Sequence, residues 1–296
     1  MQRQFQNFYG RAWGVEKSFL VEMESAVRAG HAFAVAEPRG LQSRSARGGI
    51  AVLPLLGVLF QRANFLTEFF GGTSLDRFAG EFRLAVQNPG VSAIVIEVDS
   101  PGGEVSGVPE LAAEILAARS KKKIVAVANS FAASAAHWIA SAASEFVASP
   151  SAKVGSIGVY ALHLDFSKAM AVSGIKPTFI SAGKFKTAGN ELEPLTAEAA
   201  AATQKIVDSF YEMFVRDVAR GRGVTMKAVR SGFGEGRVVL AAEARQLGMV
   251  DRVATLDEVI AGLSSGKNKS LSASASASAR AANENARARL RLQQIS

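Results

Sequence analysis

Three short segments combine small residues with side chains that can attack or hold a polar group, and each follows an apolar run of strand type. They are Asp99–Glu104, Asn129–Trp138 and Gly183–Asn190. The chain has no Cys, so its candidate nucleophiles are hydroxyl groups, and a hydroxyl needs a base such as His or Lys beside it. These residue types therefore permit nucleophilic attack by a serine.

The first segment, Asp99-Ser-Pro-Gly-Gly-Glu104, places two glycines between a predicted strand and a predicted helix. Glycine lets the backbone approach a ligand closely, and the exposed N–H groups of such a turn can stabilise an oxyanion. An ordinary turn between a strand and a helix uses the same residues. Taken alone, the segment favours that structural interpretation.

The second segment offers Ser134, which lies among alanines at a predicted helix start. Small neighbours leave space for a substrate backbone, and the positive end of a helix favours a negatively charged oxygen. Serine is also common as an N-cap for structural reasons alone, and Ser130 would serve as the cap equally well. The pattern indicates a candidate nucleophile at Ser134 and leaves a simple cap as the alternative.

The base for such a serine must be a histidine or a lysine. His137 lies three residues after Ser134 on the same predicted helix, where its ring would compete with a substrate for space. Only Leu164 separates His163 from Asp165, so no second segment of the chain offers a histidine together with an orienting Asp. Lys186, in the third segment, can accept a proton in its uncharged form, which desolvation beside Phe185 would favour. A solvated loop lysine is the default alternative.

The composition narrows the classes of function. With three His and no Cys, the sequence offers no basis for a multi-histidine or thiolate metal site, so we expect no metal and no cofactor. No apolar run reaches the roughly 18 to 20 residues of a membrane span, which predicts a cytoplasmic protein that does not enter a membrane. The net charge of +8 lies at the two ends of the chain, so nucleic acid contact is expected at most through the basic C-terminal tail.

The apolar pattern predicts an α/β fold in which strands alternate with helices around a largely parallel sheet. The chain divides into a partly helical N-terminal extension (1–48, with a helix at about 14–29), a main domain (49–263) and a disordered Ser/Ala/Arg-rich tail (264–296). Predicted strands include Ile50–Leu59, Val91–Val98, Ile124–Ala128, Phe146–Ala148, Ile157–Ala161 and Pro177–Ser181. Predicted helices include Leu75–Val86 with Thr73 as a possible cap, Val105–Ala118, Ser134–Ser144, Asp165–Ser173 and a long helix from Thr196 to about Arg220.

Five motifs follow one another in a distinctive order. They are the strand Ile50–Leu59 ending in Gly57-Val, then Asp99-Ser-Pro-Gly-Gly, Ala132-Ala-Ser-Ala-Ala, Gly155-Ser-Ile-Gly-Val and Gly183-Lys-Phe-Lys. This set resembles the signal peptide peptidase A family of serine proteases over about residues 49–262. The segment Lys186–Leu195 is more similar to the phage branch of that family, the capsid (head) maturation proteases.

The resemblance implies a crotonase/Clp-protease-like fold of repeated β-β-α units, with residues 49–263 as the serine protease domain. It implies that Ser134 is the nucleophile, that Lys186 is its general base, and that the backbone N–H groups of Gly103 and Ala135 form the oxyanion hole. Thr187 is expected to hydrogen-bond the lysine. The family usually has Gly-Gly after the serine, whereas this chain has two alanines, whose amides still donate.

The resemblance also implies protein or peptide substrates and a homo-oligomer in which neighbouring subunits can contribute to one site. The expected function is that of a phage or prophage prohead protease that cleaves scaffold and capsid proteins, in the host cytoplasm or the prohead interior. Three alternatives stay open: a soluble bacterial protease resembling signal peptide peptidase, a crotonase-type acyl-CoA enzyme, and a non-catalytic assembly protein of the same fold.

Overall fold

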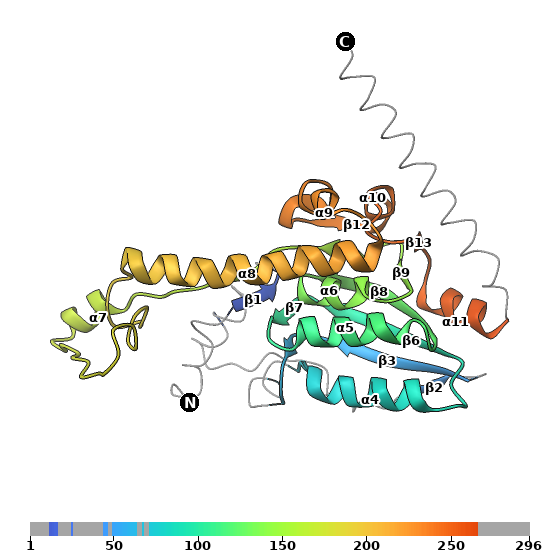
Figure 1. The fold of residues 1–296 in the computed structure, drawn as a ribbon, viewed down its shortest axis with the longest axis horizontal. Helices are drawn as coiled ribbons and strands as arrows, with labels where there is room; N and C mark the ends of the chain where they lie inside the picture. The colour runs from blue at the N-terminus through green and yellow to red at the C-terminus, as the bar shows by residue number, and fades with distance from the viewer. Residues whose placement is uncertain are drawn as a thin grey trace, which may run out of the picture.

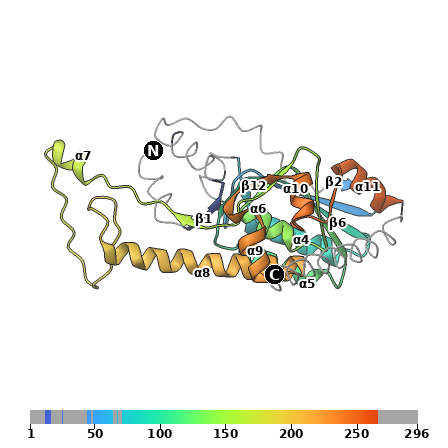
Figure 2. The ribbon, with the colours of Figure 1, turned by 90° about the horizontal axis from the view of Figure 1, so that it is seen from above.

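The computed structural model describes residues 12–16, 25, 44–46, 49–63, 67 and 71–265. Two sheets and their covering helices form the body, and a long arm projects from one side of it (Figures 1 and 2). The predicted tail beyond residue 265 and most of the predicted N-terminal extension lie outside the described residues. Within the described part of the chain, no helix is long and apolar enough to cross a membrane.

The larger sheet is built from apolar, β-branched runs that are buried on both faces, as is typical of parallel strands. Its path runs β12-β10-β8-β6-β3-β2, with β10, β8, β6 and β3 mutually parallel and the two edge strands antiparallel. The first part of β8 also pairs in parallel with β9, which pairs in turn with β13. These strands are β2 (Arg44–Ala46), β3 (Ile50–Leu56), β6 (Ala93–Ser100), β8 (Lys123–Ala133), β9 (Glu145–Ala148), β10 (Lys153–Gly155), β12 (Val238–Leu240) and β13 (Arg252–Val253).

Successive side chains of the central strands point to opposite faces of the sheet. In β6, Ile94 and Ile96 belong to the main core, whereas Val95 packs on the other face with Val259. Helices α4, α5, α6 and α8 supply the main core, and α11 covers the second face. The helices are α4 (Leu75–Gln87), α5 (Val108–Ala118), α6 (Ala135–Ser141), α7 (Ser167–Val172), α8 (Ala197–Arg222), α9 (Met226–Gly232), α10 (Ala241–Gln246) and α11 (Leu256–Ser264).

The smaller sheet lies beside the carboxyl end of β6, where the chain continues into β7. Its order is β11-β1-β7-β4-β5, and β7 follows β6 after a single residue, Pro101. The strands are β1 (Ala12–Val15), β4 (Leu59–Phe60), β5 (Thr73–Ser74), β7 (Gly102–Glu104) and β11 (Tyr160–Ala161). The Gly-Gly segment singled out by the sequence is therefore a strand of this second sheet and no longer a simple turn.

Most predicted elements of the body are confirmed, with shifted ends. The Thr196 side chain caps α8 by accepting from the N–H of Ala199 at 3.2 Å. The cap of α4 is Ser74 and not Thr73, because the Thr73 hydroxyl donates to the carbonyl oxygen of Leu56 at 2.6 Å.

Three predictions need correction. The strand predicted over Pro177–Ser181 is wrong: residues 178–181 are exposed, Ile180 fully so, and among the described residues no strand lies beside them to accept their backbone hydrogen bonds. The strand predicted from Ile157 begins only at Tyr160. The first residues of the helix predicted at about 14–29 lie in β1, because that segment pairs with β7 and β11.

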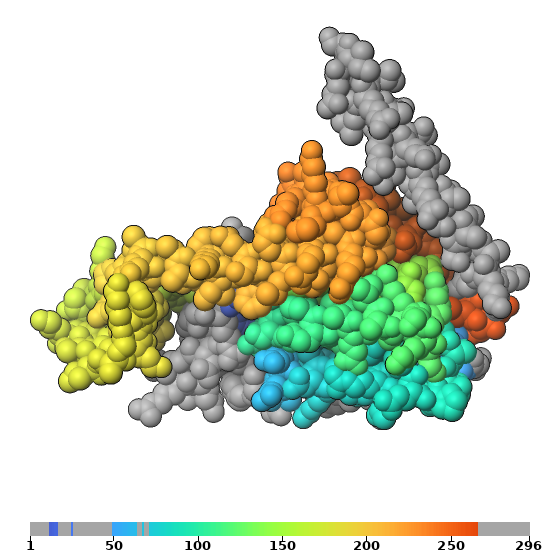
Figure 3. Space-filling view, in the orientation of Figure 1, coloured from blue at the N-terminus to red at the C-terminus, as the bar shows by residue number. Residues whose placement is uncertain are grey.

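The arm, residues 162–196, leaves the body after β11 and returns at the start of α8 (Figures 2 and 3). It contains α7, which has no buried residue. Its apolar side chains are turned to solvent: Val172 is 90% exposed, and Phe185 is 57% exposed. Exposed apolar side chains of this kind are the feature of the arm that the proposed function must explain.

Candidate active site

Ser134 sits on a sharp turn between the end of β8 and the start of α6. Its backbone has φ 53° and ψ −121°, a conformation that costs a non-glycine residue on the order of 1–3 kcal/mol. A backbone hydrogen bond fixes the turn, since the N–H of Ser134 donates to the carbonyl oxygen of Gly155 at 2.7 Å. Backbone strain that the surrounding structure enforces is typical of a functional residue.

The hydroxyl of Ser134 does not cap the helix. It donates to the carbonyl oxygen of Gly158 at 3.4 Å, and α6 has no side-chain cap hydrogen bond. Ser130, the alternative cap, lies within β8 and donates to the carboxylate of Asp99, so that alternative is wrong. The interpretation of Ser134 as a simple N-cap therefore loses its structural basis.

The two proposed oxyanion donors lie on elements that flank the serine. Ala135 is the first residue of α6, and Gly103 lies in β7. A Cβ built on Gly102, whose φ is +98°, would lie 3.1 Å from the backbone nitrogen of Ala135, so strand and helix start are in contact. The hydroxyl of Ser100 accepts from the N–H of Gly102 at 3.1 Å and fixes this turn.

The Gly155-Ser-Ile-Gly158 segment has a role that the residue types alone did not reveal. Its first and last carbonyl oxygens receive the amide and the hydroxyl of Ser134. These contacts are made by backbone oxygens, so the side-chain types of the segment do not predict them. A sequence feature that could have indicated this role is the pair of glycines at the two ends of the motif.

His137 is not placed to serve as a base. Its side chain is completely buried, and its ring packs edge-on against Phe146 with 5.3 Å between the centroids. Burial, with a smaller contribution from the charge of Arg222, lowers the pKa of His137 to about 3. The imidazole is therefore neutral at physiological pH and belongs to the core.

Lys186 and Thr187 lie on the arm, and the structure does not bring them to Ser134 within one copy of the chain. The neighbouring Lys184 pairs with Glu198 in the first turn of α8 at 3.1 Å. The nucleophile helix contacts α8 far from that end, where Trp138 stacks on Phe214 with 4.5 Å between ring centroids. At 1.5 Å per residue, the two contact points on α8 are about 24 Å apart.

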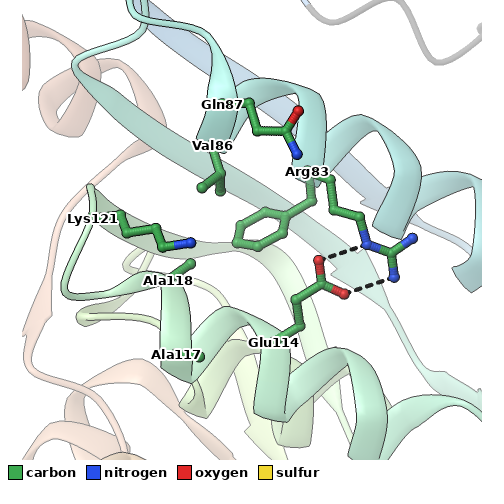
Figure 4. A pocket seen from close by; sticks show the side chains of 8 residues that line it. Arg83, Val86, Gln87, Glu114, Ala117, Ala118 and Lys121 are labelled. Atoms are coloured by element: carbon green, nitrogen blue, oxygen red, sulfur yellow. Dashed lines mark hydrogen bonds and ion pairs between the residues drawn. The ribbon is translucent and has the colours of Figure 1, made fainter.

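A separate pocket of about 310 Å³ lies between α4 and α5, and Ser134 is not among its lining residues (Figure 4). Arg83 and Glu114 close one side of it with two hydrogen bonds of 2.8 Å each. The remaining lining residues are Phe82, Val86, Gln87, Ala117, Ala118 and Lys121. None of them is a nucleophile paired with a base, so the candidate active site remains the Ser134 turn.

The comparison with protein families decides the classification. The model of peptidase family S49 matches residues 117–270, which include the Ser134 turn, the arm and α8. The chain belongs to this family. As an S49 peptidase it has the predicted crotonase/Clp-protease-like α/β fold, and the resemblance to the signal peptide peptidase A proteases is confirmed.

Two phage proteins are similar to this member of the family over 75% of its length. The head-tail preconnector protein GP5 of Enterobacteria phage P21 and the capsid assembly protease C of Escherichia phage lambda are each 31% identical to it. The chain spans 44% and 50% of their respective lengths. Protease 4 of Salmonella typhi is 30% identical over 64% of the chain and 31% of its own length. Among solved structures, the 1510-N membrane-bound stomatin-specific protease covers 72% of the chain at 16% identity, with a TM-score of 0.43.

Proposed function

We propose that this S49 peptidase is a serine endopeptidase that cleaves capsid and scaffold proteins during phage head assembly, with Ser134 as nucleophile and Lys186 of a neighbouring copy as general base. The observation that carries the proposal is the strained, uncapped Ser134 at the start of α6, next to Ala135 and in contact with the Gly102–Gly103 strand. Similarity to phage capsid proteases supports the choice of substrate.

The proposed chemistry gives each group one role. The Oγ of Ser134 attacks the carbonyl carbon of a peptide bond, and the uncharged amine of Lys186 takes the hydroxyl proton. The N–H groups of Gly103 and Ala135 stabilise the negative oxygen that develops on that carbon. The lysine then gives its proton to the leaving amine, and it activates the water that hydrolyses the acyl-enzyme.

The arm is what makes a second copy necessary. Lys186 is exposed and lies on the arm, where the nearby Lys184 pairs with Glu198 in the first turn of α8. The nucleophile helix contacts α8 further along, at Phe214, so in a single copy Ser134 lacks its base. The apolar side chains of the arm, above all Val172 and Ile180, are exposed and fit a protein surface better than water.

Thr187 and the turn around it would orient that lysine. The side-chain amide of Asn190 donates to the carbonyl oxygen of Thr187 at 2.8 Å, and the N–H of Lys186 donates to the carbonyl oxygen of Gly183 at 3.1 Å. This part of the arm is therefore a hydrogen-bonded turn, which would present the lysine in a defined direction. In the proposed site the Thr187 hydroxyl accepts a hydrogen bond from the lysine amine.

Mixing two inactive variants tests the proposal. Ser134→Ala and Lys186→Ala should each lose cleavage of casein and of a capsid scaffold protein, as read by intact mass. A hetero-oligomer formed from equal amounts should recover about a quarter of the wild-type activity, because random neighbours restore a complete site in one case of four. Lys184→Ala, two residues from Lys186 on the same arm, is the matched control and should remain active.

Each result has a clear meaning. Full activity of Lys186→Ala would remove the lysine from the mechanism. Two inactive variants that do not complement, although sedimentation shows that they co-assemble, would place the base within one copy. Lack of cleavage by the wild-type oligomer, even with a scaffold protein present, would favour a non-catalytic assembly role.

A further inference from the structure

The N-terminal strand β1 lies directly over the Ser134 turn. It is inserted between β7 and β11 and is antiparallel to both, with Gly14 opposite Gly103 and Trp13 opposite Tyr160. An extended chain that lies antiparallel between two strands satisfies its backbone groups on both sides, which is how many peptide-binding clefts hold a peptide. The occupant here belongs to the protein itself.

The register of β1 places a peptide carbonyl at the proposed oxyanion hole. Flanking hydrogen bonds run from the N–H of Val105 to the oxygen of Ala12 at 3.4 Å and from the N–H of Glu16 to the oxygen of Pro101 at 2.8 Å. Hydrogen-bonded pairs recur every second residue in an antiparallel ladder, so Gly14 and Gly103 form the pair between them. The amide proposed to bind a substrate oxyanion therefore faces the Gly14 carbonyl.

Gly14 also lies against the nucleophile. A Cβ built on Gly14 would stand 3.3 Å from the Oγ of Ser134 and 3.5 Å from the backbone nitrogen of Ala135. With β1 in place, Ser134 is 1% exposed. A substrate peptide cannot reach the hydroxyl without moving the strand.

The strand is anchored by its side chains as well as by its backbone. Trp13 is 1% exposed and Val15 is 2% exposed. Burying an aromatic and an aliphatic side chain removes their apolar surface from water and stabilises the strand in this position. The strand therefore competes with substrate as a built-in ligand of appreciable strength.

We propose that residues 12–16 are an internal inhibitory strand that occupies the peptide-binding cleft between β7 and β11 and keeps Ser134 latent until it is displaced. The inference rests on the proposed function, because it takes Ser134 as the nucleophile. It assigns the cleft a ligand class, an extended peptide whose residue nearest Ser134 is glycine, since a Cβ there meets the hydroxyl at less than ordinary contact distance.

The test measures how fast a fluorophosphonate probe labels Ser134 in the full chain, read by intact mass. Gly14→Val introduces a branched side chain against the hydroxyl and should raise the labelling rate about tenfold or more, because the rate follows the fraction of molecules with an open cleft. Gly80→Val is the matched control: a Cβ at Gly80 meets nothing within 4 Å, so its rate should equal that of the wild type. Trp13→Ala, which removes an anchor and leaves Gly14 unchanged, should also raise the rate.

A synthetic peptide of residues 10–17 completes the design. Added to Gly14→Val, it should return labelling toward the wild-type rate, and the same peptide with valine in place of glycine should not. Equal labelling of the wild type and both folded variants would overturn the inhibitory strand while leaving Ser134 as nucleophile. Absence of labelling in every variant would overturn the proposed function, and the inhibitory strand with it.

Discussion

The amide of Ser134 and the carbonyl oxygen of Gly155 are joined by a hydrogen bond of 2.7 Å. The bond connects the end of β8 to the end of its parallel neighbour β10, so the order of strands in the larger sheet holds the serine in its strained conformation. The position of the candidate nucleophile is thus a property of the sheet, and the following predictions test how that position is maintained.

Replacing Ser134 should reveal the strain in its backbone. Ser134→Gly and Ser134→Ala both remove the hydroxyl, but only glycine adopts φ 53° and ψ −121° readily. We expect Ser134→Gly to have a free energy of unfolding about 1 kcal/mol above that of Ser134→Ala. Urea unfolding measures the difference, and an alanine variant at least as stable would show that the turn is unstrained.

Adding a methyl group at Gly102 should disturb the oxyanion hole. A Cβ there would lie 3.0 Å from the oxygen of Ala133 and 3.1 Å from the nitrogen of Ala135, and these contacts persist when β1 is displaced, so the backbone beside Ser134 must shift. We expect Gly102→Ala to lower kcat about 100-fold, the typical effect of losing an oxyanion donor. Gly80→Ala, in open space on α4, should leave kcat unchanged, and an active Gly102→Ala would exclude Ala135 as a donor.

Replacing Arg119 by lysine should destabilise the fold. Its guanidinium donates to the carbonyl oxygens of Ala142 at 2.7 Å and Gly221 at 3.0 Å, and thereby joins the end of α6 to α8. Burial, reinforced by the nearby charge of Arg222, lowers the pKa of Arg119 to about 10. A lysine lacks the planar fork, so we expect Arg119→Lys to lose about 2 kcal/mol of unfolding free energy. Chemical denaturation with a loss under 0.5 kcal/mol would contradict this expectation.

Glu145 should make stability depend on pH. Burial alone would raise the pKa of Glu145, but hydrogen bonds and charges from Lys123 at 2.9 Å and Arg252 at 2.6 Å outweigh it and hold the pKa below its ordinary value. This contribution is complete above the ordinary value of about 4.3 and is lost as the pH falls through the lower folded-state pKa.

The comparison variant is Glu145→Gln, which should cost about 2 kcal/mol at pH 7 and progressively less under acid conditions. Unfolding curves at pH 7 and pH 3 provide the measurement. Glu114→Gln breaks the surface pair with Arg83 and should cost less than about 1 kcal/mol. A cost for Glu145→Gln that does not change with pH would exclude its charge as the cause.

The body of the fold could be predicted because its signals are local. The apolar run Ile94–Val98 has the composition of a buried strand, and Thr196 precedes a long amphipathic stretch with the geometry of an N-cap. The Gly-Gly segment and Ser134 could be singled out for the same reason. Each needs only its own neighbours in sequence to be recognised.

Other features depend on contacts that local sequence does not encode. Pro177–Ser181 has strand composition but has no described strand to pair with, so it stays extended and exposed. Gly14 lies in a strand because its segment pairs with β7 and β11, although the sequence predicts that a helix begins there. The resemblance could name Lys186 as the base, but its distance from Ser134 follows from the length and direction of α8.

Helix α8 spans 26 residues, which at 1.5 Å per residue is about 39 Å. One end carries the arm, and the other is locked to the nucleophile helix, where a Cβ on Gly221 would lie 2.3 Å from the carbonyl oxygen of Ser141. Together with the stacking of Trp138 on Phe214, this contact makes α8 one continuous connection between the arm and the helix that follows Ser134. A partner that binds the arm is therefore joined to the nucleophile helix by a single secondary-structure element.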